Sequence, residues 1–472
     1  MRPSAALPML PVVPRSLVLL LLVAVLPASA SAAPVATTVT VRMFDYRDVL
    51  SRTTVPVGTV RFVVVNRGAS PHDFAIGGKR TRMLKRGERQ TLVLRFKRAG
   101  RYTYVCTVPG HAHLGMKGTL RVGKPKPKPQ PAPPPPAPTA LTLVKIGDFE
   151  LPTDVDAPPG DSSRLVVVEQ RGLVHLLVDG VRREQPFLDL GPLVRAQGEA
   201  GLLSIAFAPD YATSGLVYAF YNDRPGNLRL VELQRSPSNP DTIDAGSARE
   251  LLHQVKFAAN HNGGMLQFGH DGRLYVGVGD GGSGPSHKPG LFAQDKASVF
   301  GKVLRLDPKT GAWDVWARGL RNPWKFWHDP VSGQTFVGDV GQDRREEVNV
   351  IPAGTDEINF GWPCFEGTLP FDAEERCDDP VTPVHEYAHA QDACSITGGV
   401  VLRDPRLPSL AGAFVFGDLC STGLRSLLVE GGAVVAAPLG VEVAAPTTFG
   451  VDGLGRVYVG SGTGAVYRVD PK

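Results

Sequence analysis

The sequence has few cysteines, no long apolar run beyond its N-terminus and no basic stripe, and each of these features would have indicated a particular class of protein. It has only five cysteines in 472 residues, and an odd number leaves at least one without a partner in the chain. It has no long apolar run after residue 26 and no basic stripe with interleaved aromatic residues, which argues against membrane-spanning and nucleic-acid-binding proteins. Glycine (53) and proline (42) are abundant beside an apolar fraction of 42%. Together these values predict a folded, turn-rich, all-β chain of two or three domains.

The N-terminus has the composition of a secretory signal. Arg2 and Arg15 flank an apolar core at Leu17–Leu26, and small residues at 28–32 offer a cleavage site. The core is short for a membrane span, so we predict a signal peptide over residues 1–32. The mature protein would then be secreted, to the periplasm or the medium, where disulfides form. A retained membrane anchor is the alternative interpretation.

Four of the cysteines lie in the C-terminal half of the chain. Their order favours the bridges Cys364–Cys377 and Cys394–Cys420, although the sequence does not exclude the two other pairings. The fifth, Cys106, stands alone far upstream. An unpaired cysteine in a secreted protein needs a role, and the residues around Cys106 point to a metal.

Residues 36–122 read as short strands separated by turns, which predicts a small β-sandwich or barrel. His72 lies just after one of these strands. On the loop that leaves another strand, four residues separate Cys106 from His111, and four more separate His111 from Met116. One thiolate, two imidazoles and a weak thioether form the ligand set of a blue copper site. We therefore predict that these four residues bind copper.

On these residues, the segment resembles the cupredoxin family, plastocyanin and auracyanin in particular. The resemblance implies a type 1 copper centre with four protein ligands and no open position, which transfers electrons and does not bind substrate. The domain is also rich in Lys and Arg, for example Lys79 and Arg80. These residues could dock an acidic redox partner, but a solvated face is the simpler interpretation.

Residues 123–139 are dominated by proline and lysine. Proline fixes φ and removes hydrogen-bond donors, so we expect an extended polyproline II segment. It would act as a semi-rigid spacer that keeps the first domain near the second without fixing their contact.

One phrase recurs six times in residues 140–472: an acidic turn, a gap, and a strand rich in valine or aromatic residues. The copies begin at Asp161, Asp210, Asp271, Asp329, Asp404 and Asp452. Repeats of this size, made of strands and turns, predict a propeller of six four-stranded blades. The chain would close by pairing residues 141–146 with residues 466–468, and the long fourth interval would hold an insertion. A two-sheet all-β fold is the alternative.

A hairpin within the third repeat organises the candidate site. Two apolar runs, 265–268 and 274–278, flank a Gly-His-Asp-Gly turn, which is a hairpin signal. His261 lies just before the first run and Asp280 just after the second. Both side chains are therefore expected at the same rim of the sheet.

Four further motifs follow in order, and together with this hairpin they resemble the glucose/sorbosone dehydrogenase family, the soluble quinoprotein sugar dehydrogenases. They are residues 301–307, 319–323, 338–349 and 359–362. The resemblance implies a six-bladed propeller with pyrroloquinoline quinone (PQQ) on its axis, held through Ca²⁺, that oxidises a sugar hydroxyl. By position, His261 is then the general base and Asp280 orients it. Arg321 polarises the quinone oxygen, and Asn322 is its neighbour in the site.

Other positions match the family in part. Gly341 and Gln342 match the pair whose backbone carbonyls bind Ca²⁺. Glu199 stands against the cofactor where the glucose enzymes carry a glutamine. The lysine and paired arginines that the family uses for the PQQ carboxylates have no clear match, and Ser421 lies near the expected lysine. Residues 394–399 and 416–420 look more like the sorbosone-dehydrogenase and hedgehog-interacting-protein branch.

These observations predict a secreted PQQ- and Ca²⁺-dependent aldose dehydrogenase that passes electrons to its own tethered type 1 copper domain. A downstream redox protein or respiratory acceptor would follow. The alternative is a non-catalytic binding propeller that carries a blue-copper electron-transfer module. A multicopper oxidase would need a second copper cluster, and the other propeller histidines lack ligand-like spacing. No nucleic-acid partner and no stable membrane span are predicted.

Overall fold

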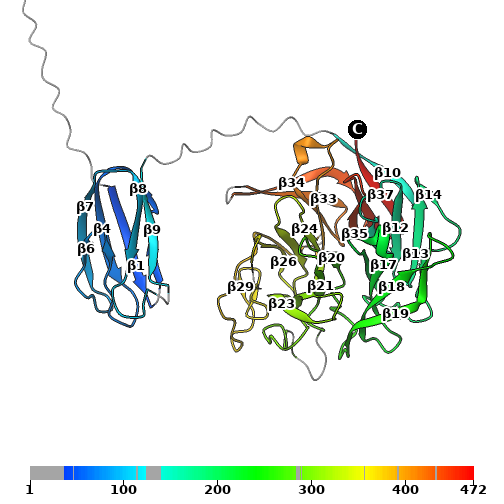
Figure 1. The fold of residues 1–472 in the computed structure, drawn as a ribbon, viewed down its shortest axis with the longest axis horizontal. Helices are drawn as coiled ribbons and strands as arrows, with labels where there is room; N and C mark the ends of the chain where they lie inside the picture. The colour runs from blue at the N-terminus through cyan, green and yellow to red at the C-terminus, as the bar shows by residue number, and fades with distance from the viewer. Residues whose placement is uncertain are drawn as a thin grey trace, which may run out of the picture. The chain divides into compact units, whose positions relative to one another are not determined.

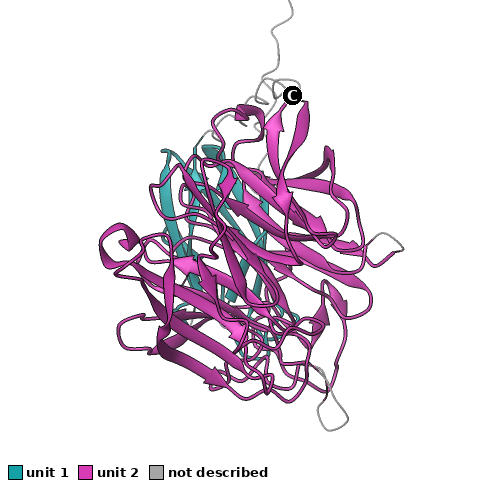
Figure 2. Cartoon of the chain, turned by 90° about the vertical axis from the view of Figure 1, so that its right-hand side faces the viewer, with its two compact units in different colours: residues 1–132 teal, residues 133–472 magenta. Residues whose placement is uncertain are grey.

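The structure is a computed structural model that describes residues 37–45, 47–112, 115–123, 140–282, 288, 290–355, 357–390, 393–430 and 433–472. The predicted signal peptide and all of the predicted linker except Gly123 lie outside these residues. The chain divides into two compact units, residues 1–132 and 133–472 (Figure 2). Among the described residues, no helix is long and apolar enough to cross a membrane.

The first unit is a β-sandwich of two sheets, which confirms the predicted fold (Figure 1). The first sheet has the order β2-β1-β4-β7, with bounds Arg47–Leu50, Thr37–Phe44, Gly58–Asn66 and Arg89–Phe96. The second has the order β3-β9-β8-β5-β6, with bounds Thr54–Val55, Lys117–Val122, Gly100–Val105, Ala75–Ile76 and Lys79–Arg80. Alternate residues of each long strand point inward, so that Val60, Phe62 and Val64 enter one shared core.

The second unit contains six sheets of four or five strands, one for each repeat. The first three are β11 to β15 (Pro152–Asp156, Arg164–Glu169, Leu173–Val178, Val181–Arg182, Leu188–Asp189), β16 to β19 (Leu202–Phe207, Leu216–Asn222, Leu228–Arg235, Ile243–Gln254), and β20 to β23 with β27 (Leu266–Phe268, Leu274–Val278, Lys302–Leu306, Trp313–Arg318, Ile358–Asn359). The others are β24 to β26 with β30 (Pro323–His328, Thr335–Asp339, Arg345–Ile351, His385–Ala388), β31 to β34 (Ile396–Val401, Phe414–Asp418, Gly423–Glu430, Ala433–Glu442), and β35 to β37 with β10 (Pro446–Val451, Val457–Ser461, Ala465–Pro471, Leu141–Asp148).

The sheets are arranged as the blades of a ring (Figure 1). The first strands of neighbouring blades contact one another in sequence order, except that the second strand β21 of the third blade meets β24 of the fourth, and β35 closes the circle against β11. The ring is locked by β10, which pairs with the final strand β37 so that Leu141 lies opposite Pro471 and Lys145 opposite Tyr467. The predicted six-bladed propeller and its closure are confirmed.

The acidic turn of each repeat lies between the first and second strands of a blade. In five of the six turns the aspartate side chain accepts a backbone N–H, whereas Asp210 precedes a short helix, Tyr211–Ser214, without such a bond. Asp452, for example, accepts the N–H groups of Leu454 and Arg456, while Asp329 accepts the N–H of Ser332 and pairs with Arg403. This is the local chemistry that favours aspartate in turns, and it explains why the repeat was visible in the sequence.

The long fourth interval inserts a segment between β26 and β30. The insertion contributes β27 to the edge of the preceding blade and forms a separate hairpin, β28 (Phe365–Glu366) and β29 (Leu369–Pro370). The disulfides Cys364–Cys377 and Cys394–Cys420 are both present, which are the pairings favoured by the order of the cysteines.

The two units carry opposite charge. Residues 37–123 hold seventeen Lys and Arg against four Asp and Glu, whereas residues 140–472 hold 29 against 42. All seventeen basic side chains within residues 37–123 are exposed. The modest net charge of +5 therefore hides a strongly basic unit and a strongly acidic one.

Candidate functional site

At one end of the sandwich, three potential metal ligands converge. His72 Nδ1 lies 3.1 Å from His111 Nδ1, and Cys106 Sγ lies 4.0 Å from the first and 3.8 Å from the second. Met116 is fully buried, and its backbone bonds both to Cys106 and to His111. Three ligand atoms directed at one point, with a buried thioether beside them, fit a trigonal copper site with an axial sulfur.

Neighbouring carboxylates hold these ligands in place. His72 Nε2 is 2.9 Å from Asp45 Oδ1, which leaves Nδ1 to face the thiol. Hydrogen bonds from the Ser70 and Ala69 N–H groups, and then from His72, lower the pKa of Asp45 to about 2, so this group stays charged. Burial raises the pKa of the Cys106 thiol, so a metal that binds the thiolate must displace its proton. Such outer-shell partners fix the ring orientation of ligating histidines.

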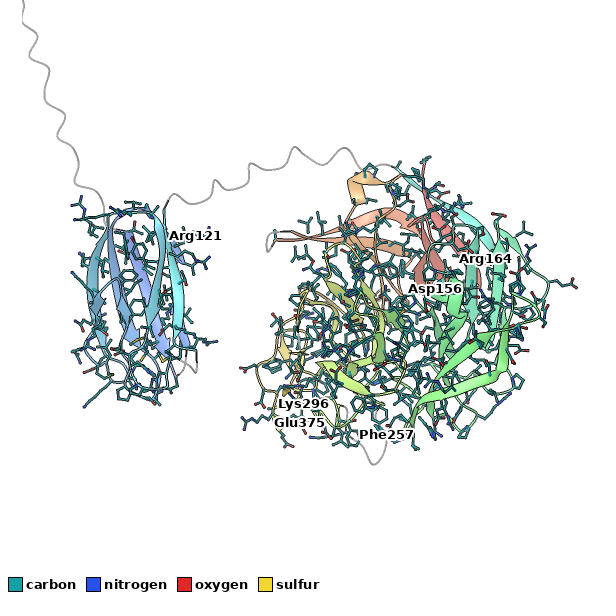
Figure 3. All side chains as sticks on the ribbon, in the orientation of Figure 1. Arg121, Asp156, Arg164, Phe257, Lys296 and Glu375 are labelled. Carbon is teal, nitrogen blue, oxygen red and sulfur yellow. A yellow bond between two sulfur atoms is a disulfide. The ribbon has the colours of Figure 1, made fainter. Side chains whose placement is uncertain are left out.

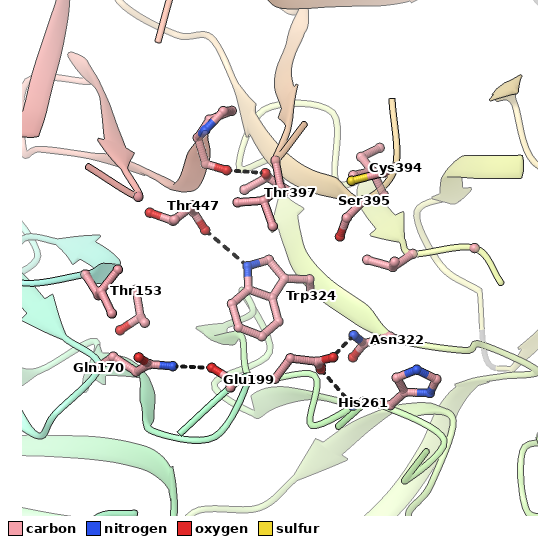
Figure 4. Close-up of a pocket in the computed structure, with 18 of the residues that line it drawn as sticks. Thr153, Gln170, Glu199, His261, Asn322, Trp324, Cys394, Ser395, Thr397 and Thr447 are labelled. Carbon is pink, nitrogen blue, oxygen red and sulfur yellow. Dashed lines mark hydrogen bonds between the residues drawn. The ribbon is translucent and has the colours of Figure 1, made fainter. Parts of the chain in front are cut away.

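On the propeller, a cavity of about 440 Å³ is lined by residues from all six blades. It contains six of the seven residues that sequence reasoning assigned to the propeller site, namely His261, Arg321, Asn322, Glu199, Gly341 and Gln342; the seventh, Asp280, lies behind His261 and not in the lining. Further lining residues, which that reasoning did not assign, include Gln170, Trp324, Thr397 and Thr447. Figure 4 shows the indole of Trp324 among the lining side chains, with its N–H donating to the Thr447 carbonyl.

The centre of this site is a buried histidine–aspartate pair. His261 Nδ1 lies 2.6 Å from Asp280 Oδ1, and the other oxygen of Asp280 accepts the Trp362 indole N–H at 2.8 Å. Burial by itself would raise the pKa of Asp280, but the hydrogen bond from His261 and the charge of Arg321 lower it below its ordinary value. Asp280 is therefore an anion that fixes the ring and leaves His261 Nε2 as the nitrogen available to a ligand.

The backbone of His261 is also fixed by a side-chain hydrogen bond. Its φ is +52°, in the left-handed region that non-glycine residues rarely occupy. Its N–H donates to Glu199 Oε2 at 2.7 Å, and the same oxygen accepts from Asn322 Nδ2 at 3.3 Å. Glu199 thus links His261 to the Arg321–Asn322 segment, a contact between blades that sequence alone did not reveal.

Arg321 is fixed by its neighbours in the next blade. Its Nε donates to Gln342 Oε1 at 3.0 Å and its Nη1 to the Val340 carbonyl at 2.9 Å, while the guanidinium lies over the Trp362 ring. The buried carboxylate of Asp339 accepts the Arg321 and Asn322 N–H groups. One guanidinium nitrogen has no described protein partner, so Arg321 can still bind an oxygen in the cavity.

The loop predicted to hold calcium borders the same cavity. Gly341 donates to Glu346, and one oxygen of Glu366 accepts the N–H groups of the four residues 342–345 at 2.6 to 3.0 Å. A side chain at Gly341 would overlap the Arg345 carbonyl, so the tight turn requires glycine. Glu366 lies in the insertion, and no local sequence pattern connects it with this loop.

Comparison with known proteins agrees with both units. The model of the Glucose / Sorbosone dehydrogenase family matches residues 149–442, and a Cupredoxin-like domain model matches residues 17–122. The chain therefore belongs to the glucose/sorbosone dehydrogenase family and carries a cupredoxin-like domain ahead of that part.

The similar proteins include HIPL and Hedgehog-interacting proteins, found by sequence, and sugar dehydrogenases, found by structure. HIPL1 protein of Arabidopsis thaliana is 29% identical over 374 residues, covering 60% of this chain and 53% of its own. Hedgehog-interacting protein of Mus musculus is 36% identical over 172 residues, covering 33% of this chain and 24% of its own. The chain thus spans about half or less of these relatives. The PQQ-bound aldose sugar dehydrogenase of Streptomyces coelicolor shares the fold, with a TM-score of 0.56 and 22% identity over 71% of this chain and 99% of its own.

Proposed function

We propose that this protein is a secreted quinoprotein dehydrogenase that oxidises a sugar hydroxyl and delivers the electrons to its own copper-binding unit. The observation that carries the proposal is the His261–Asp280 pair at the wall of the propeller cavity, with Arg321 and Asn322 beside it. A fixed histidine with one free ring nitrogen is suited to take a proton from an alcohol. A buried, oriented guanidinium is suited to stabilise negative charge that develops on an oxygen.

The residues that line the cavity fit PQQ on the condition that Ca²⁺ supplies additional positive charge. The Trp324 indole and the glycines at 198 and 341 leave room for a flat ring, and PQQ, when bound, supplies the hydride acceptor. PQQ carries three carboxylates, and Arg321 is the only Lys or Arg among the described residues that line the cavity. Additional positive charge must therefore come from Ca²⁺, which we place on the backbone oxygens of Gly341 and Gln342. PQQ binding should then depend strictly on Ca²⁺.

The copper-binding unit suits the role of electron acceptor. The set of His72, Cys106, His111 and Met116 includes no open position, so copper held there would exchange electrons without binding substrate. A two-electron donor on the same polypeptide must pass its electrons singly, and covalent linkage gives the acceptor a high effective concentration. A separate redox protein or respiratory acceptor would then reoxidise the copper.

An optical experiment tests this proposal. The full chain is loaded with Cu²⁺, Ca²⁺ and PQQ, a panel of aldoses is added, and the blue thiolate-to-copper band is followed. We expect sugar to bleach the band, and we expect no bleaching in His261→Ala although that variant remains blue. Bleaching that persists in His261→Ala would contradict the assigned base. PQQ uptake with no bleaching by any sugar would contradict the proposed transfer to copper.

A second candidate is a non-catalytic binding propeller. Glu199 places a carboxylate on the cavity wall, and Arg321 is the single cationic side chain that the described residues contribute to the lining, which suits a neutral polyhydroxyl ligand better than a tricarboxylate. Isothermal titration with PQQ in the presence and absence of Ca²⁺ separates the candidates. Failure of PQQ to bind with Ca²⁺ present would favour this second function.

A further inference from the structure

A lysine outside the cavity lies directly behind the candidate base. Lys256 follows strand β19, and its Nζ donates to the Asn260 carbonyl at 2.6 Å and to the His261 carbonyl at 3.2 Å. The ammonium also lies 5.9 Å from the centre of the Phe300 ring, within the range of a cation–π interaction. We propose that Lys256 is a positioning residue that fixes the Asn260–His261 turn and balances the carboxylates of Glu199 and Asp280. The assignment of His261 as a base rests on the proposed function, whereas the structural role of Lys256 does not.

The turn needs such an anchor because its conformation is unfavourable. His261, which is not a glycine, has φ of +52°. Residues in such conformations persist only where the surrounding structure holds them. Three charged side chains hold His261: Glu199 accepts its N–H, Asp280 binds its ring, and Lys256 donates to its carbonyl. Removing the Lys256 ammonium would leave the Asn260 and His261 carbonyls without a described side-chain donor.

The positive charge of Lys256 has a second role, which is to offset the negative charges near His261. The charged groups that approach His261 come from four elements: Glu199 before β16, Lys256 after β19, Asp280 after β21 and Arg321 before β24. Two carboxylates and two cations balance one another. Burial lowers the pKa of Lys256 to about 8, against the opposing attraction of Asp280 and Glu199. Lys256 thus offsets negative charge from both Asp280 and Glu199.

Hydrogen exchange of the full chain tests the anchoring role without any activity. Lys256→Met should accelerate amide exchange in the peptide covering residues 257–264 by roughly tenfold, because the turn opens locally. Lys256→Arg should restore slow exchange. Lys296→Met is the matched control, since Lys296 is exposed and pairs with Glu357 at the surface of the same unit (Figure 3). If Lys256→Met does not fold, Lys256→Gln replaces it as the neutral variant.

Exchange in residues 257–264 that is unchanged in the neutral variant would overturn the proposal, whether or not sugar is oxidised. Equal acceleration in the neutral and Arg variants would also overturn it, since charge would then play no part. Absence of sugar oxidation in the native chain would instead count against the proposed function alone.

Steady-state kinetics of sugar oxidation test the charge-balancing role of Lys256. Activity should fall as pH rises through about 8, because Lys256 loses its proton there, and Lys256→Arg should shift that limb to higher pH. Lys256→Met should lower kcat roughly 10²-fold at neutral pH, since small misplacements of a catalytic group have effects of that size. Adding Glu199→Gln to Lys256→Met should recover part of the loss by rebalancing charge. Losses that simply multiply would contradict the charge-balancing role.

Discussion

His261 Nδ1 and Asp280 Oδ1 lie 2.6 Å apart inside the propeller, although 19 residues separate them in the chain. The hairpin β20–β21 brings them together, because its two ends meet at the same edge of the blade. Asp280 also accepts the N–H groups of Gly282, Gly290 and Trp362. Its carboxylate therefore fixes the ring of His261 in a single orientation.

Asp280→Asn should disable the pair while preserving its shape. An amide cannot stabilise the protonated ring and can favour the wrong tautomer, so we expect sugar oxidation to fall roughly 10³-fold. Steady-state kinetics with the best aldose measures the effect, and Asp241→Asn at a surface ion pair with Arg164 is the control. A loss smaller than a few-fold would show that Asp280 does not orient a base.

The ligand cluster of the first unit makes a separate prediction. Cys106→Ser should abolish the blue absorption, since the band needs the thiolate. Met116→Leu should keep the blue colour and raise the reduction potential, because the axial thioether stabilises the oxidised ion. Absorption spectra and a redox titration check both results. A blue Cys106→Ser protein would refute the assigned ligand set.

Glu199→Gln is expected to tighten the binding of an anionic cofactor. The amide oxygen of Gln can still accept from the His261 and Asn322 N–H groups, so the loop should stay in place while one negative charge leaves the cavity wall. Removal of one like charge nearby is worth about 1 kcal/mol, or roughly fivefold in Kd. Titration with PQQ at fixed Ca²⁺ measures it. Unchanged or weaker binding would show that the carboxylate does not oppose the cofactor.

Buried Glu347 should make the propeller less stable as pH rises. Burial, and then the charge of Asp339, raise its pKa to about 8. The unfolded chain releases this proton near pH 4.5, so between about 4.5 and 8 the folded state holds a proton that the unfolded state has lost, and stability falls with pH.

Glu347→Gln should remove this dependence. Asn349 Nδ2 now donates to Glu347 Oε2 at 3.0 Å, so the Asn349 amide must turn over for its Oδ1, which has no described partner, to accept from the new Gln amide. The Gln oxygen can still accept the Gly367 N–H. We expect a gain of about 1 kcal/mol at pH 9 and little gain at pH 4.5, measured by thermal unfolding. An equal gain at both values would locate the effect in packing rather than in titration.

The opposite charges of the two units predict a salt effect. Attraction between a basic and an acidic body is screened within a Debye length of about 8 Å at 0.15 M salt. We therefore expect the proposed electron transfer to copper to slow when NaCl is raised from low concentration to 0.5 M, as followed by stopped-flow bleaching of the blue band. A rate independent of salt would mean that the charges do not assist transfer.

Much of this architecture was predictable because its determinants are local. Aspartates in turns marked every blade, and the Cys106–Met116 spacing marked the ligand loop. His261 and Asp280 were predictable partners because one hairpin joins them. Gln170, Trp324 and Thr447 line the cavity from different blades, and only closure of the ring brings them together. No spacing rule in one sequence records such non-local contacts.

The pairing of β10 with β37 sets an order of assembly during synthesis. Walls of the propeller cavity come from positions as far apart as Leu151 and Gly462, so the cavity cannot exist until nearly the whole chain has been made. The sandwich is complete at Val122, and domains that emerge first generally fold first. A chain cut short before β37 should thus keep its metal-ligand cluster and lose its cavity. The proposed electron acceptor is therefore complete before the proposed catalytic site that would supply its electrons.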